Sequence, residues 1–386
     1  MGGRGGLMLH GDVLGERARI SPDRTALVEV DSGRRFTYAE LDERARRCAA
    51  AWLEGLGLAP GDRVGVLAGN RVELLDAFFA AGKSGVVVVP LGTKLTVREL
   101  EPVVRDAGLS ALLFDGELAG TALELGRRAS IPHLVAFDPG DGTTRSYPEL
   151  AAGVGTLRKR VPVDPEDPYC LLYTSGTTGR PKGVVIPHRM VAFNGHATAV
   201  CWQLGEDDVS PVFTPLYHAG ALGAFLVPLV TVGGTIVLHS GFDPAEVLAT
   251  MESEGCTVVL GVPTIFRLLA EAPEMAATDL SRLRFFISGG APLPVELVRR
   301  YRELGIVLRQ GYGLTEVGVN CFTMSDEEAW SRAGSVGRPM MMTEARVVGE
   351  DGVPRPTGEV GELVFRGPHV SRGYFQNPEA THAAFD

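Results

Sequence analysis

Short, nearly continuous runs of Val and Leu alternate with helical patterns along most of the chain. The first runs are DRVGVLA (62–68), GVVVVP (85–90) and ALLFD (111–115), and a helical pattern separates each from the next. Such fully apolar strands are typical of parallel sheets that helices cover on both faces. The alternation therefore predicts an α/β fold.

The clearest helix is expected just after Thr37. Thr37 and Glu40 have the spacing of a capping box, an apolar face follows, and Gly57 fits the C-terminal stop.

Two changes in composition divide the chain. Residues 140–168 are polar and turn-rich, and from about 331 onward short strands with Gly/Pro turns replace the helical patterns. We therefore expect two packed α/β subdomains with mainly parallel sheets covered by helices, at 1–165 and 166–330. A small C-terminal β-barrel-like unit is expected at 331–386.

Charge and cysteine content exclude several classes of protein. With 386 residues, of which 45% are hydrophobic, the chain is long enough to bury a large core. A net charge of −10 argues against a general nucleic-acid or membrane-surface binder, so any anion must meet a local positive field. The five cysteines are scattered without metal-ligand spacing, and no secretory signal is evident, which favours a reducing, cytoplasmic location.

Residues 219–238 form an uncharged stretch of membrane-spanning length. Pro228 interrupts it and Gly233-Gly234 indicates a turn, so we interpret it as a buried helix, a turn and a buried strand.

The sequence LLYTSGTTGRPKGVV (171–185) contains a core that cannot fill a hydrophobic interior. Its glycines allow close backbone approach, its hydroxyls donate hydrogen bonds and its lysine supplies a cation, a combination that suits a polyphosphate. The residues concerned are Thr174, Ser175, Gly176, Thr177, Thr178, Gly179, Lys182 and Gly183. A solvated hairpin turn is the alternative, but it does not need four hydroxyls in five residues.

The sequence Gly82-Lys83-Ser84 imitates part of a P-loop but lacks its first glycine, because residue 77 is Ala77. We therefore discount it.

A second polar cluster is RQGYGLTE (309–316), after a predicted strand. Tyr312 lies between two glycines with a ring face open for stacking, and Thr315 and Glu316 offer a hydroxyl and a carboxylate. These groups together suit a metal-bound nucleotide, although Gly-Tyr-Gly is also a common turn.

Two further loops are candidates. ISGGAPLP (287–294) follows a predicted strand, and ligands in open α/β sheets bind beyond strand C-termini, although an ordinary strand–helix connection explains this loop equally well. TPLYHAGALGA (214–224) places small residues after His218, leaving room for an apolar ligand, but taken alone this motif favours close helix packing with a core histidine.

Together these motifs resemble the adenylate-forming superfamily of acyl-CoA synthetases, luciferase and peptide-synthetase adenylation domains. YTSGTTGRPKG, GVPT, GGAPL, YGLTE and GELVFRGPHVSRGYFQNPEAT occur in the family's order. The chain looks most similar to bacterial fatty acyl-CoA ligases.

The resemblance implies two steps: attack of a carboxylate on ATP, giving an acyl-adenylate and pyrophosphate, and transfer of the acyl group to coenzyme A. It implies Thr174, Lys182, His218, Thr315 and Glu316 as catalytic residues, with Thr174 and Glu316 serving Mg²⁺. The implied nucleotide-binding residues are Thr174–Gly179, Lys182, Gly289, Gly290, Ala291, Pro292, Gln310, Gly311, Tyr312, Gly313 and Thr315. The implied acyl pocket contains His218, Ala219, Gly220, Ala221, Gly289 and Gly313.

The implied substrate is a hydrophobic acid. No aspartate lies near His218 in the sequence to pair with an amino acid's ammonium group. The neighbourhood is apolar and has no evident arginine for a second carboxylate, although Arg267 stays open as an exception. A fatty acid is expected, an aryl acid is the near alternative, and an acyl-AMP ligase that passes its product to a carrier protein is a third. The expected partners are small molecules, without nucleic acid, and a homodimer is compatible with the sequence.

The sequence ends at HAAFD, where family members continue into a ribose-binding stretch and a C-terminal domain with a catalytic lysine. The resemblance therefore implies an N-terminal domain that binds ATP weakly and has very low ligase activity. If the short chain is natural, a non-catalytic nucleotide- or acyl-binding domain is the alternative.

Overall fold

The computed structural model describes residues 10–138, 144–174 and 181–385. Five residues of the expected phosphate loop lie outside the described residues: Ser175, Gly176, Thr177, Thr178 and Gly179.

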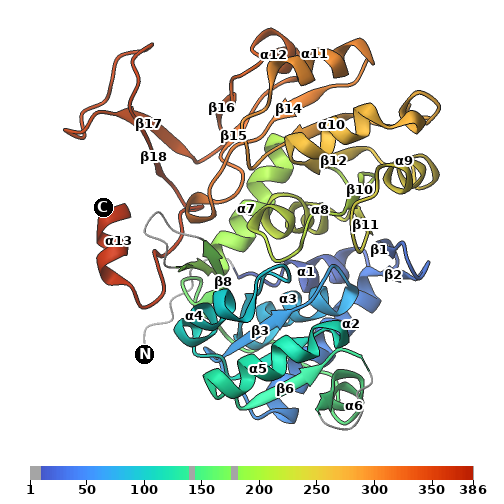
Figure 1. The fold of residues 1–386 in the computed structure, drawn as a ribbon, viewed down its shortest axis with the longest axis vertical. Coiled ribbons are helices and arrows are strands. Elements are labelled where there is room, and N and C mark those ends of the chain that lie inside the picture. The colour runs from blue at the N-terminus through green and yellow to red at the C-terminus, as the bar shows by residue number, and fades with distance from the viewer. Residues whose placement is uncertain (1–9, 139–143, 175–180, 386) are drawn as a thin grey trace.

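A seven-stranded sheet forms the lower part of the molecule in Figure 1. Its pairings are parallel except for the last, between β8 and β9, which is antiparallel. In spatial order the strands are β7 (Arg145–Ser146), β6 (His133–Ala136), β5 (Ala111–Phe114), β3 (Arg63–Leu67), β4 (Val87–Pro90), β8 (Pro168–Thr174) and β9 (Lys182–Pro187).

Two smaller sheets follow. The four-stranded sheet has the order β10 (Val209–Val212), β11 (Thr235–Leu238), β1 (Thr25–Glu29) and β2 (Arg35–Thr37). The three-stranded parallel sheet contains β12 (Val258–Gly261), β13 (Phe285–Ser288) and β14 (Leu308–Gln310). Strand β1 pairs with β11, and β4 pairs with β8. Both sheets therefore contain strands from before and after residue 165. The division at 165 and 330 stays a prediction.

Helices pack around these sheets and confirm the α/β prediction (Figure 1). The α-helices are α1 (Val13–Ile20), α2 (Tyr38–Ala50), α3 (Val72–Ser84), α4 (Val97–Ala107), α5 (Ala119–Ala129), α6 (Tyr147–Ala152), α7 (His188–Cys201), α8 (Val227–Val232), α9 (Pro244–Ser253), α10 (Pro263–Glu271), α11 (Val295–Glu303), α12 (Asp326–Ser331) and α13 (Pro378–Ala384). The π-helical segments are η1 (Ala51–Gly55) and η3 (Gly220–Leu226). The 3₁₀ segments are η2 (Gly116–Leu118), η4 (Pro273–Ala276) and η5 (Thr315–Val317).

Two local expectations are confirmed. The capping box of Thr37 and Glu40 starts α2, with both reciprocal hydrogen bonds formed. The uncharged stretch 219–238 folds as η3 and α8, a turn at Gly233 with φ of 88°, and the strand β11. Among the described residues, no helix combines the length and apolar character needed to cross a membrane.

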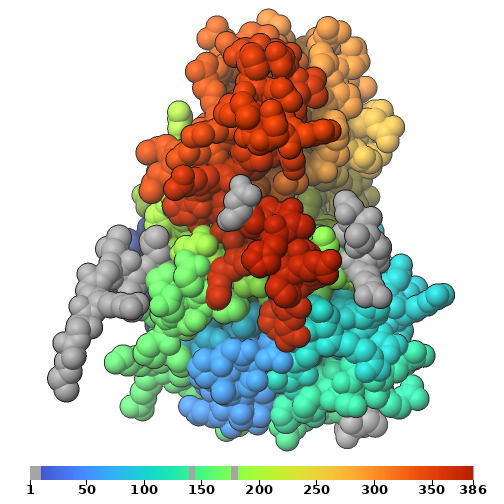
Figure 2. All heavy atoms as spheres, turned by 90° about the vertical axis from the view of Figure 1, so that its left-hand side faces the viewer, coloured from blue at the N-terminus to red at the C-terminus, as the bar shows by residue number. Residues whose placement is uncertain are grey.

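The expected C-terminal barrel is not seen among the described residues. The strands after 331 lie in two separate two-stranded antiparallel ribbons: β16 (Arg338–Pro339) pairs with the earlier strand β15 (Phe322–Thr323), and β17 (Glu344–Val348) pairs with β18 (Glu362–Arg366). Repeated Gly/Pro turns in the sequence predict hairpins correctly but do not specify how hairpins join into a larger sheet. Figure 2 shows the last described residues, in red, on the surface where the green and orange parts meet.

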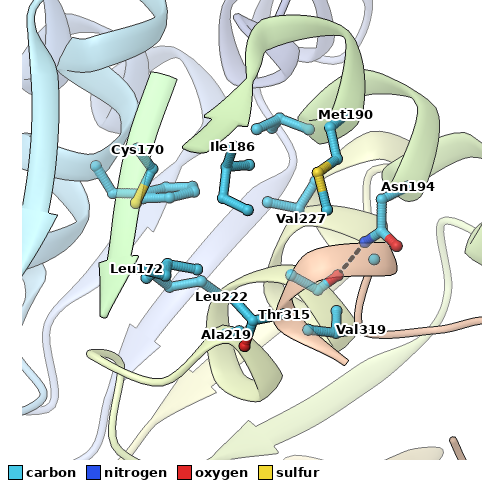
Figure 3. A pocket seen from close by; sticks show the side chains of 14 residues that line it. Cys170, Leu172, Ile186, Met190, Asn194, Ala219, Leu222, Val227, Thr315 and Val319 are labelled. Atoms are coloured by element: carbon cyan, nitrogen blue, oxygen red, sulfur yellow. Dashed lines mark hydrogen bonds between the residues drawn. The ribbon is translucent and has the colours of Figure 1, made fainter. Parts of the chain in front are cut away.

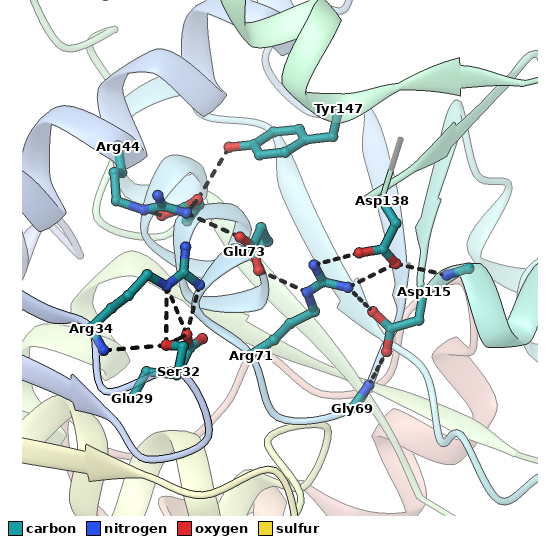
Figure 4. A network of polar contacts seen from close by, with 12 residues as sticks. Glu29, Ser32, Arg34, Arg44, Gly69, Arg71, Glu73, Asp115, Asp138 and Tyr147 are labelled. Atoms are coloured by element: carbon teal, nitrogen blue, oxygen red, sulfur yellow. Dashed lines mark hydrogen bonds and ion pairs between the residues drawn. The ribbon is translucent and has the colours of Figure 1, made fainter. Parts of the chain in front are cut away.

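Arg71 links three neighbouring strand ends of the large sheet (Figure 4). It follows β3, while Asp115 and Asp138 follow β5 and β6. The guanidinium lies 2.6 Å from Asp115, 3.0 Å from Asp138 and 2.7 Å from Glu73. Its hydrogen bonds hold the pKa of Asp138 below the ordinary value. Ion pairs between protein side chains therefore occupy this part of the sheet's carboxyl edge.

Lys83 is 2% exposed and lies between two buried carboxylates. Its ammonium is 2.7 Å from Asp12 Oδ1 and also contacts Asp42, so it attaches the segment before α1 to α2 and α3. This position is consistent with discounting Gly82-Lys83-Ser84 as a phosphate loop.

Replacing Lys83 with Met should lower the free energy of unfolding by about 3 kcal/mol, because two buried carboxylates lose their shared cation. Urea unfolding followed by circular dichroism measures the change. Lys94→Met, at an exposed lysine, is the control. Equal stability of the two variants would contradict a structural role for the buried cation.

Candidate functional site

The β8–β9 hairpin brings Thr174 and Lys182 together. They are paired in register at the ends of the two strands, on either side of the loop outside the described residues. The Lys182 ammonium lies 4.9 Å from the centroid of the Tyr374 ring. The Thr174 hydroxyl and the Lys182 cation, both expected to bind phosphate, therefore lie at the two ends of one loop.

The three-stranded sheet gathers three motifs at one edge. Gly261 ends β12, Gly289 follows β13 and Gly311 follows β14, and the strands are parallel, so their carboxyl ends meet. Gly289 N donates to Gly261 O at 3.0 Å, and Gly311 N donates to Ser288 O at 2.6 Å. The loops expected to bind adenine are therefore neighbours.

Gln310 joins two of these loops. Its Oε1 accepts from Leu293 N at 2.9 Å, and its Nε2 donates to Gly311 O at 2.7 Å. The Gln310 side chain therefore connects the loop after β13 to the loop after β14 by hydrogen bonds.

Tyr312 is less open than the sequence indicates. Its ring stacks on Phe365, with centroids 6.4 Å apart and planes 23° apart, and meets the edge of Phe322. The prediction of a free ring face is corrected on this side, because β18 brings Phe365 onto it.

Glu316 lies in η5 and contacts a residue from the end of the chain. Tyr374 Oη donates to Glu316 Oε1 at 2.9 Å. Burial and this bond raise the pKa of Tyr374 to about 12, so the phenol is protonated and donates at neutral pH. Tyr374 belongs to the motif GELVFRGPHVSRGYFQNPEAT, but nothing in the sequence indicates its contact with Glu316.

The oxygen donors here fit Mg²⁺ bound together with a nucleotide. Mg²⁺ commonly takes one or two protein oxygens and completes its shell with phosphates and water. Glu316 offers a carboxylate and Thr174 a hydroxyl, whereas no cluster of three His, Cys, Asp or Glu side chains suited to a metal occurs in the described part of the chain. Glu316 and Thr174 are therefore the side chains that would hold an Mg²⁺ ion arriving with ATP.

An apolar cavity of about 50 Å³ lies between α7, η3 and the β8–β9 hairpin (Figure 3). Thr315, Gly318 and Val319 form its wall next to Glu316, and Phe78 and Cys170 line it on the side of the large sheet. The remaining lining residues are Leu172, Ile186, Met190, Val191, Asn194, Ala219, Leu222, Gly223 and Val227.

One of the six residues expected for the acyl pocket, Ala219, lines this cavity. His218, next to it, is exposed, and partial burial of its ring lowers its pKa below the ordinary value. Like His218, the other four expected residues are absent from the lining: Gly220, Ala221, Gly289 and Gly313. The lining residues from α7 and β8 were not predicted from the sequence, because their apolar pattern is the same as that of an ordinary hydrophobic core.

Asn70, also missed, holds the segment before His218. Its Nδ2 donates to Thr214 O at 3.0 Å and to His239 O at 3.1 Å, and its Oδ1 accepts from Leu216 N at 2.8 Å. A single asparagine in a loop after β3 carries no sequence signal for this long-range contact.

Comparison with known proteins identifies related chains. Residues 14–375 match the model of the family described as AMP-binding enzyme. A feruloyl-CoA synthase from Amycolatopsis sp is 40% identical over 367 residues, covering 95% of this chain and 71% of that protein. The long-chain-fatty-acid–CoA ligase FadD13 of Mycobacterium tuberculosis is 34% identical, covering 97% and 74%. The N-terminal domain of FACL13 from Mycobacterium tuberculosis superposes with a TM-score of 0.90 at 32% identity, covering 98% of this chain and 94% of that one.

The space at Gly289 offers a test of the nucleotide site. A Cβ at Gly289 would meet no atom within 4 Å, so Gly289→Leu should fold normally. If nucleotide occupies that space, the side chain should weaken ATP binding about tenfold, or 1.4 kcal/mol. Calorimetric titration and thermal unfolding measure the two effects.

Gly241→Leu is the matched control, since Gly241 also has open space around its Cβ position. Unchanged ATP affinity in Gly289→Leu would exclude this loop from the site.

Proposed function

Because the chain belongs to the AMP-binding enzyme family and the relatives named above are AMP-forming CoA ligases, we propose that it activates a hydrophobic monocarboxylic acid with ATP. The carboxylate oxygen bonds to the α-phosphorus of ATP and pyrophosphate leaves. The thiol of coenzyme A then attacks the acyl carbon, giving acyl-CoA and AMP. A fatty acid is the first candidate substrate.

The main support is the position of the apolar cavity. It reaches Thr315, whose neighbour Glu316 is connected through Tyr374 to Lys182. An acid with its tail in the cavity would present its carboxylate beside the groups proposed for the triphosphate.

The chemistry requires two anions to approach each other. Lys182 and the Thr174 hydroxyl would stabilise the phosphates, and the Thr315 hydroxyl would donate at the α-phosphate. When bound, Mg²⁺ would neutralise part of the phosphate charge, with Glu316 and Thr174 as its protein ligands. Preorganised donors of this kind lower the barrier because they need no reorientation as charge develops.

The cavity lining favours an uncharged tail. Its residues are apolar apart from Asn194 and Thr315, and none is charged. An ammonium group or a second carboxylate would be buried there without a partner, which costs several kcal/mol.

An aryl acid is a second candidate, favoured by two observations. The relative with 40% identity is named a feruloyl-CoA synthase, whereas the fatty-acid ligase is 34% identical. A cavity of about 50 Å³ has room for only a few water-sized groups, so a long chain requires more widening than a compact ring.

A series of non-hydrolysable acyl-adenylate analogues tests the substrate class by equilibrium binding. Dodecanoyl and feruloyl analogues should bind at least tenfold more tightly than succinyl and aminoacyl analogues, because the latter bury a charge. Preference between the first two separates the two candidates. Tighter binding of a charged analogue would contradict the proposal.

Ala219→Leu should weaken binding of the preferred apolar analogue about tenfold, because added methyl groups occupy the cavity wall. Affinity for ATP alone should not change. Ala277→Leu, at an exposed alanine, is the control. Equal loss of ATP and analogue affinity would indicate damage to the whole site instead of a change in the acyl pocket.

A further inference from the structure

Tyr374 contacts both charged groups of the proposed triphosphate site. Its ring faces the Lys182 ammonium at 4.9 Å from the centroid, and its phenol donates to Glu316 at 2.9 Å. The cation and the carboxylate are thus bound to different parts of one side chain.

The backbone on both sides of Tyr374 is fixed. Val185 N donates to Gly373 O at 2.9 Å and Phe375 N donates to Gly183 O at 2.7 Å, so residues 373–375 run alongside β9. Tyr374 N donates to Thr381 Oγ1 at 3.0 Å, which attaches it to α13. Because β9 begins at Lys182, the ring and the cation are held by the same pairing.

The glycine before Tyr374 is required by this arrangement. Gly373 has φ of 93°, and a Cβ there would lie 2.4 Å from Thr381 Cγ2. The same segment is tied to η5, since Ser371 N donates to Glu316 O at 2.8 Å. The three parts that meet here, β9, η5 and residues 371–375, are therefore connected by backbone bonds.

A lysine and a glutamate that share one small site tend to pair with each other. A direct pair would occupy the cation that phosphate needs and the carboxylate oxygens that Mg²⁺ needs. A tyrosine ring between them gives the cation a cation–π contact and the carboxylate a single hydrogen bond, leaving other donor and acceptor positions free.

We propose that Tyr374 is a positioning residue that keeps Lys182 and Glu316 apart and orients both toward Mg·ATP. The phenol holds one oxygen of Glu316, so the other oxygen would be left to bind Mg²⁺. The ring prevents Lys182 from neutralising Glu316 before ATP arrives. This inference rests on the proposed function, because it assumes that the site binds Mg·ATP.

Two substitutions separate the roles of the phenol and the ring. Tyr374→Phe retains the ring and should weaken ATP binding about tenfold in Mg²⁺ but less than twofold in EDTA, because only the orientation of Glu316 is lost. In a Glu316→Gln background the same substitution should have less than a twofold effect, since the two groups act as a pair.

Tyr374→Leu removes the ring as well and should also weaken ATP binding in EDTA, because Lys182 can then pair with Glu316. Adding Glu316→Gln should restore that EDTA affinity by removing the competing carboxylate. A merely structural role for Tyr374 predicts no such rescue.

Tyr173→Phe is the matched control, since the Tyr173 phenol donates to a different carboxylate, that of Asp106, at 2.5 Å. Calorimetric titration of the chain with ATP, in Mg²⁺ and in EDTA, measures all variants without requiring turnover. If the unsubstituted chain does not bind Mg·ATP, the proposed function fails and this inference with it. If it binds and Tyr374→Phe matches the Tyr173→Phe control, or if Glu316→Gln does not rescue Tyr374→Leu, only the inference is overturned.

Discussion

The pairing of residues 373–375 with β9 is the constraint on which the proposed site depends. It brings a segment from near the chain's end onto a hairpin that forms about two hundred residues earlier, and so places Tyr374 between Lys182 and Glu316. Without these backbone bonds the ends of β8 and β9 would have no contact with η5 through this tyrosine. The loop expected to bind phosphate would then have its lysine but no carboxylate oriented opposite it.

The second element of the site is the parallel sheet of β12, β13 and β14. Its carboxyl edge collects glycine-rich loops from three separate stretches of sequence, and Gln310 joins two of them. The large sheet uses its carboxyl edge differently, because Arg71 fills part of it with ion pairs to Asp115 and Asp138. Ion pairs therefore occupy part of the large sheet's carboxyl edge, whereas the loops of the smaller sheet are the ones proposed to bind adenine.

Much of this organisation follows from local sequence signals. The capping box of Thr37 and Glu40, the turn at Gly233 and the strands before Gly289 and Gly311 were predictable because each depends on neighbouring residues. What could not be predicted depends on contacts between distant residues. Phe365 covering Tyr312, Asn70 holding Thr214 and the phenol of Tyr374 reaching Glu316 leave no periodic pattern. The apolar lining from α7 and β8 was missed because a cavity wall and a packed core use the same residues.

The central claim is that Lys182, Tyr374 and Glu316 form the site for a metal-bound triphosphate next to an apolar cavity. A crystal structure of the chain with Mg²⁺ and a non-hydrolysable ATP analogue tests it most directly. The account predicts phosphates between the Lys182 ammonium and the metal, the metal on the free oxygen of Glu316, and the Tyr374 ring still separating the two side chains. Phosphates bound elsewhere, or Lys182 directed away from them, would contradict it.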